Sequence, residues 1–133
     1  MGVLNLLAKR PDRRVSFAEI SREAGQVLEA GNRAERARYS ELATLTFCRQ
    51  VRSCKAEMLR RSCKNLAILT NRLSRALQLV FPDLHFYVET LQSLQRRLSA
   101  YAAAAASPQL TIFETYPLRV LEGVLRGLRR SRR

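Results

Sequence analysis

The chain has 133 residues, which favours a single domain with a modest hydrophobic core. Hydrophobic residues make up 47% of it, a fraction that excludes a wholly disordered chain. The formal net charge of +13 indicates a polyanionic partner, either nucleic acid or an anionic membrane surface.

The first predicted element is a short helix over 16–30. Ser16 and Glu19 have the spacing of a capping box, and Val15 and Ile20 stand where a hydrophobic staple would form. Gly31 suits the position just after a helix. These local signals predict both ends of the helix.

A long basic element follows. Asn32 is a good N-cap, and the 49 residues of 33–81 contain no Pro and no Gly. One continuous helix of that length would extend about 73 Å at about 1.5 Å per residue, beyond ordinary helix lengths. The sequence therefore predicts either one long helix or two helices, with 62–65 favoured as the break.

Pro82-Asp83 predicts a tight turn between that element and a second helix with heptad patterning. The leucine stripes on both sides of the turn predict an antiparallel helical hairpin over 32–106, made of the long basic helix and the heptad helix. The expected layers pair Val80 with Leu84, Leu73 with Leu91, and Leu66 with Leu98.

Ser107-Pro108 predicts the end of the heptad helix. We expect 110–116 to be an ordered connection and Pro117 to begin a short C-terminal helix. Residues 129–133 form a frayed basic tail that adds affinity for nucleic acid, acts as a nuclear localisation signal, or is inert. The expected fold is thus all-α, with 1–133 as one helical domain.

The positive charge is concentrated in the long element. Residues 32–81 carry 11 basic and 3 acidic groups, whereas 82–107 carry 2 of each. On a wheel of about 100° per residue, Arg49, Arg60, Lys64 and Arg75 fall within about 80°, opposite the apolar stripe. The residues predicted to bind nucleic acid are Arg38, Arg49, Arg52, Ser53, Arg60, Arg61, Lys64, Asn71, Arg72 and Arg75.

Duplex RNA is the favoured partner of this surface. The chain has 21 arginines and 3 lysines, and arginine binds phosphate with two donors. It has no Trp, and single-strand sites without sequence preference need several aromatic side chains for stacking. A regular row of phosphate contacts with hydroxyl and amide groups nearby suits shape recognition of A-form RNA.

Three alternatives stay open. The basic face could be an ordinary solvated surface, although only Glu57 interrupts it. A helical adaptor could use the same row to bind an acidic protein. The amphipathic segment 117–133 could attach to an anionic membrane surface.

We expect a homodimer, because Leu42, Leu45, Phe47 and Ile68 broaden the apolar surface beyond one hairpin seam. The sequence predicts no enzyme, metal or cofactor site, since His85 is the only histidine and no phosphate-binding glycine loop occurs. Three cysteines without framework spacing favour a reducing location inside the cell, in the cytoplasm or, through the tail, the nucleus.

A small chain with a long basic helical hairpin over 32–101 and a short terminal helix resembles the nodavirus double-stranded-RNA-binding suppressors of RNA silencing. The resemblance is architectural, and it does not extend to the helix over 16–30 or to the arginine tail. It implies a viral protein that forms a homodimeric four-helix bundle along one face of duplex RNA. Such a dimer would mask the RNA from the host's dicing and loading machinery.

Overall fold

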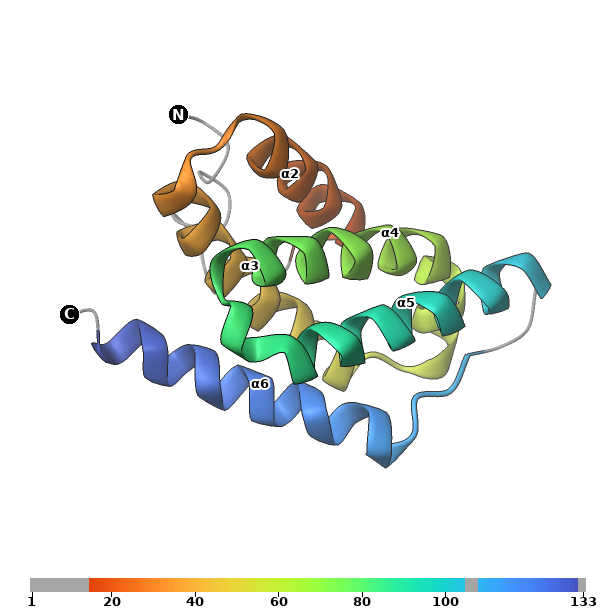
Figure 1. Ribbon diagram of the computed structural model, residues 1–133. Helices are drawn as coiled ribbons and strands as arrows, with labels where there is room; N and C mark the ends of the chain where they lie inside the picture. Colours follow the sequence, from red (N-terminus) through yellow and green to blue (C-terminus); the bar gives the residue numbers. More distant parts are fainter. Residues whose placement is uncertain (1–14, 105–107, 132–133) are drawn as a thin grey trace.

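The computed structural model describes residues 15–104 and 108–131 of the chain. Within these ranges the protein is all-helical and has no strand, which confirms the predicted fold class. The helices are α2 (Phe17–Ala30), α3 (Arg33–Ser53), α4 (Ala56–Val80), α5 (His85–Ala104) and α6 (Ile112–Ser131), with a short 3-10 turn, η1 (Pro82–Leu84), between α4 and α5 (Figure 1).

The predicted caps of α2 and α3 are confirmed. The Ser16 hydroxyl accepts a hydrogen bond from the Glu19 N–H at 3.1 Å, and the Asn32 side-chain oxygen accepts one from the Glu35 N–H at 2.9 Å. Gly31 follows α2 with an ordinary φ of −77°, so glycine is not required there for its backbone conformation. Glycine is required there for steric reasons, because a Cβ at Gly31 would lie 2.6 Å from the Val27 carbonyl oxygen, too close for van der Waals contact.

The predicted break in the long element exists, but its predicted position was wrong. The chain leaves the helix at Cys54 and Lys55, whose extended backbones have ψ of 138° and 157°, and 62–65 lie inside α4. The Ser53 hydroxyl shares its proton between the carbonyls of Arg49 and Gln50, and Gln50 is one of the last four residues of α3, whose carbonyls lack a partner within the helix. The break allows α4 to turn and pack against α3, and the basic helix beside α5 is therefore α4 alone.

The helices pack around α4. It runs side by side with α5 in the opposite direction, and α2 lies along its other side (Figure 1). Helix α3 contacts α2, α4 and α6, and α6 closes the fold across α3 and α5. One side of α4 is exposed to solvent between the neighbouring helices, and this side carries the side chains of the candidate site.

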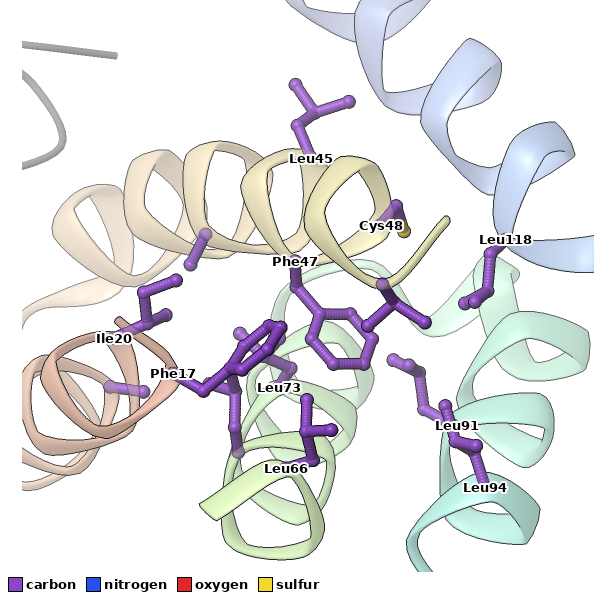
Figure 2. Close-up of a cluster of buried hydrophobic side chains, with 14 of the residues drawn as sticks. Phe17, Ile20, Leu45, Phe47, Cys48, Leu66, Leu73, Leu91, Leu94 and Leu118 are labelled. Carbon is purple, nitrogen blue, oxygen red and sulfur yellow. The ribbon is translucent and has the colours of Figure 1, made fainter. Parts of the chain in front are cut away.

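All five helices contribute to one hydrophobic core, shown in Figure 2. The Phe47 ring is fully buried and meets Phe17 edge-to-face, with 6.4 Å between ring centroids. Leu42 and Leu45 are also buried, so the prediction that they form an exposed apolar surface with Phe47 was wrong. The reason is that three helices cover α3, and a helical wheel does not reveal how many neighbours a helix has.

Helix α6 begins five residues earlier than predicted. The Thr111 carbonyl accepts from the backbone N–H groups of Glu114 and Thr115, and the Glu114 carboxylate accepts from the Thr111 N–H at 3.2 Å. Thr111 and Glu114 thus have the spacing of a capping box and one of its two hydrogen bonds, from the Thr111 N–H to the Glu114 carboxylate. Pro117 lies inside the helix instead of opening it. Arg129 and Arg130, expected in a frayed tail, form part of its last turn, whereas residues 132–133 lie outside the described residues.

The apolar face of α6 belongs to the core. Leu118, Leu121 and Leu125 are at most 1% exposed, so the leucines that a membrane surface would need are already packed. No helix in the described ranges is long and apolar enough to cross a membrane. The alternative that 117–133 attaches to a membrane surface therefore has no free leucine face at Leu118, Leu121 and Leu125.

Candidate nucleic-acid interface

The break at Cys54–Lys55 changes the geometry of the predicted basic row. Arg38 and Arg49 lie on α3, whereas Arg60, Lys64 and Arg75 lie on α4. The prediction that Arg49 shares one helix face with Arg60, Lys64 and Arg75 was therefore wrong. Its physical cause is that the extended residues between the helices interrupt the rotation of about 100° per residue on which a wheel depends.

Helix α4 by itself retains a row of basic and amide side chains. Arg60, Lys64, Asn71 and Arg75 are all exposed and fall within about 60° on the helical wheel of α4. They extend along about 22 Å of the helix at about 1.5 Å per residue. We call these four residues the α4 cation face.

The charges of the α4 cation face are not neutralised by neighbouring side chains. Among the described residues, Arg60, Lys64 and Arg75 make no ion pair within 4.0 Å. The one acidic residue of α4, Glu57, lies in the first turn and pairs with Arg61 at 2.7 Å. Three unpaired cations on one side of a helix can approach a row of phosphates together.

Two of the predicted binding residues instead hold the fold together. Arg72 is half-buried and donates to the backbone carbonyl and to the hydroxyl of Ser21 on α2. Gly25 makes room for it, because a Cβ there would lie 3.0 Å from the Arg72 guanidinium carbon. Arg52 bridges from α3 to the buried Glu122 of α6 at 2.6 Å.

The other predicted residues lie outside the α4 cation face. Arg61 is exposed and paired with Glu57, and the Ser53 hydroxyl is used to end α3. Arg38 and Arg49 are exposed and 11 residues apart, about three turns, so they share one side of α3. The structure thus brings together four of the ten predicted residues on one helix face.

Sequence reasoning missed a polar groove between α2 and α4, beside the α4 cation face. Its volume is about 380 Å³, and α2 contributes the exposed Arg22 and Gln26 to its wall. Asn65 and Arg72 face them from α4, and Glu29 is the acidic residue of the groove. No local sequence pattern predicts that Arg22 of α2 lies beside α4, because all of α3 separates α2 from α4 in the sequence.

Arg72→Ala is expected to act on stability. The change removes two hydrogen bonds of a charged donor and leaves the Ser21 carbonyl without that partner, so the free energy of unfolding should fall by about 1–2 kcal/mol. Arg75→Ala, one turn further on and exposed, should change it by less than about 0.5 kcal/mol. Urea denaturation of both variants measures this difference, and equal stabilities would contradict the structural role of Arg72.

The two buried cysteine side chains, Cys48 and Cys63, do not add a reactive group to the site. Burial raises the pKa of the Cys48 thiol, with the Glu122 carboxylate adding to the shift, and burial also raises the pKa of Cys63. Both thiols therefore stay protonated at neutral pH, the form that is a poor nucleophile. The arrangement of α4 supports binding of an extended anion.

Comparison of the chain with protein families, with curated proteins and with solved structures found no match. The fold and the site together define a small all-helical protein with an unpaired cationic face on its central helix, as far as the described residues extend.

Proposed function

We propose that the protein binds double-stranded RNA, independently of sequence, through the α4 cation face. The observation that carries this proposal is the row of Arg60, Lys64 and Arg75, which is exposed, straight and free of ion pairs with the described residues. A net charge of +13 draws the chain to any polyanion. The rigid row then favours a partner whose phosphates are themselves regularly spaced.

A duplex fits this row better than a single strand does. Single-strand binding without sequence preference relies on exposed aromatic rings beside the basic groove, and the α4 cation face contains none. Recognition of A-form RNA uses phosphate and 2′-hydroxyl contacts across a shallow minor groove. Asn71, within the row, supplies an amide for such a hydroxyl.

The polar groove between α2 and α4 extends the proposed interface. Arg22 and Gln26 add donors on α2 next to the row. Because Arg72 is held by Ser21, it fixes the position of α2 relative to α4 and so positions Arg22. In the proposal, Arg72 is a positioning residue and Arg22 a phosphate ligand.

The proposed biological role is suppression of RNA silencing, as the resemblance to the nodavirus suppressors implies. A protein that covers one face of duplex RNA masks it from enzymes that cut or load such duplexes. We include a homodimer in the proposal, because two copies on one duplex double the number of phosphate contacts and raise the avidity. Leu42, Leu45 and Phe47 cannot form its interface, since they are buried within one copy.

A competition experiment separates RNA binding from an adaptor role. Labelled duplex RNA bound to the protein is challenged with unlabelled duplex RNA and with polyglutamate at equal charge concentration. We expect unlabelled duplex RNA to displace the labelled RNA at a charge concentration at least about tenfold lower than polyglutamate requires. The reason is that phosphates in register with the row make several charge-assisted contacts at once. Equal displacement by polyglutamate would favour an adaptor that binds acidic proteins.

A further inference from the structure

Four of the seven large apolar side chains that are exposed in the described residues lie on α5 and α6, outside the α4 cation face. Phe86, Ile112, Phe113 and Tyr116 are 58%, 79%, 86% and 65% exposed. Phe86 at the start of α5 and Phe113 at the start of α6 line one groove of about 500 Å³. Ile112 and Tyr116 lie one turn apart on α6, beside Phe113. We call these four residues the aromatic edge.

Exposed apolar side chains have an unfavourable free energy in water unless another surface covers them. An aromatic side chain buries about 150–250 Å² when it is fully enclosed, so the aromatic edge presents on the order of 500 Å² of apolar surface. That is at the upper end for exposed patches on monomers, which are often functional. It is also more than half of the roughly 800 Å² that each partner buries in a standard interface.

The groove lacks the positive charge that most of the protein carries. The chain carries +13 overall, but the charged residues that line this groove are Glu89, Glu114 and Arg97, a net of −1. Arg97 and Glu114 form an ion pair with each other, so the groove carries little net charge. Two copies of a strongly basic chain repel each other over most of their surfaces, and a contact through this nearly neutral patch avoids that repulsion.

We propose that the aromatic edge is the interface of a homodimer, in which the groove between α5 and α6 of one copy receives the aromatic edge of the other. An isologous contact uses the same patch on both copies, and the groove with its projecting rings offers both halves of such a contact. The inference names the surface of the dimer included in the proposed function and rests on that part of it. The two α4 cation faces are not part of the contact and stay open to RNA.

The experiment is sedimentation of the nuclease-treated full chain at micromolar concentration in about 0.5 M salt, where repulsion between exposed charges is screened. We expect a species of twice 15.2 kDa. Phe113→Glu and Phe86→Glu should each raise the dissociation constant on the order of 30-fold or more, as removal of a central aromatic side chain does. Their far-UV circular dichroism should match the parent, since both rings are largely exposed.

Ile68→Glu is the matched control, because Ile68 is a 39% exposed apolar residue on α4 outside the aromatic edge. It should leave the dimer intact. A parent that sediments as a monomer, or a dimer that survives both phenylalanine variants, overturns the inference. Binding of short duplex RNA is measured separately at low salt, so a monomer that still binds RNA would overturn the dimer and leave RNA binding by α4 standing.

Discussion

Replacing Arg60 and Arg75 together with alanine should weaken duplex-RNA binding on the order of 100-fold, roughly tenfold for each guanidinium group that no longer binds a phosphate. The two residues mark the ends of the α4 cation face, so the variant shortens the row from both sides. The slope of log affinity against log salt should also fall by about two units, one per phosphate bound. Fluorescence anisotropy with a labelled duplex at several salt concentrations measures both quantities.

The matched control removes the same charge from elsewhere. Arg33→Ala with Arg119→Ala deletes two exposed arginines of α3 and α6 that make no ion pair with the described residues, and we expect only a few-fold decrease in affinity from weaker long-range attraction. Glu57→Gln should tighten binding slightly, because it releases Arg61 beside the row. Equal decreases in the two double variants would show that net charge, and not the α4 cation face, determines binding.

Phe47→Ala should have the largest effect on stability, lowering the free energy of unfolding by about 3–5 kcal/mol. The ring is 0% exposed and packs edge-to-face on Phe17, so its removal leaves a cavity where α2 and α3 meet the core. The measurement is the urea midpoint at submicromolar protein, which keeps association between copies out of the comparison.

Phe113→Ala is the control for that prediction, since it removes the same ring from a position 86% exposed. Its unfolding free energy should change by less than about 0.5 kcal/mol. If Phe47→Ala were as stable as Phe113→Ala, the Phe47 side chain would lie on the surface, as its place outside the hairpin seam predicts, and the packing of the core around α3 would be contradicted.

The features predictable from the sequence are those with local causes. Ser16 with Glu19 and Asn32 with Glu35 cap helices through partners three residues away, so the caps could be found without the fold. The same logic applies to Thr111 and Glu114, whose spacing was present but was obscured by Pro117, a residue more common in the first turn of a helix. The break after Ser53 has no Pro or Gly to mark it, and it is evident only from the tertiary structure, in which α4 packs against α3.

Part of the candidate site could be predicted for a similar reason. Arg60, Lys64 and Arg75 share a face because they belong to one helix, whatever surrounds it. Arg72 and Arg52 looked equivalent to them, yet their partners are 51 and 70 residues away, at Ser21 and Glu122. Contacts over such distances are set by the tertiary fold and cannot be inferred from the period of one helix.

The most direct test of the central proposal is a titration of the parent protein with duplex RNA, duplex DNA and single-stranded RNA of equal length at two salt concentrations. We expect duplex RNA to bind at least about tenfold more tightly than single-stranded RNA, because only the duplex holds phosphates in register with the α4 cation face. Affinity should fall steeply between the two salt concentrations as condensed counterions are released. Equal affinity for single-stranded and duplex RNA, or no binding of the duplex at physiological salt, would contradict the proposal.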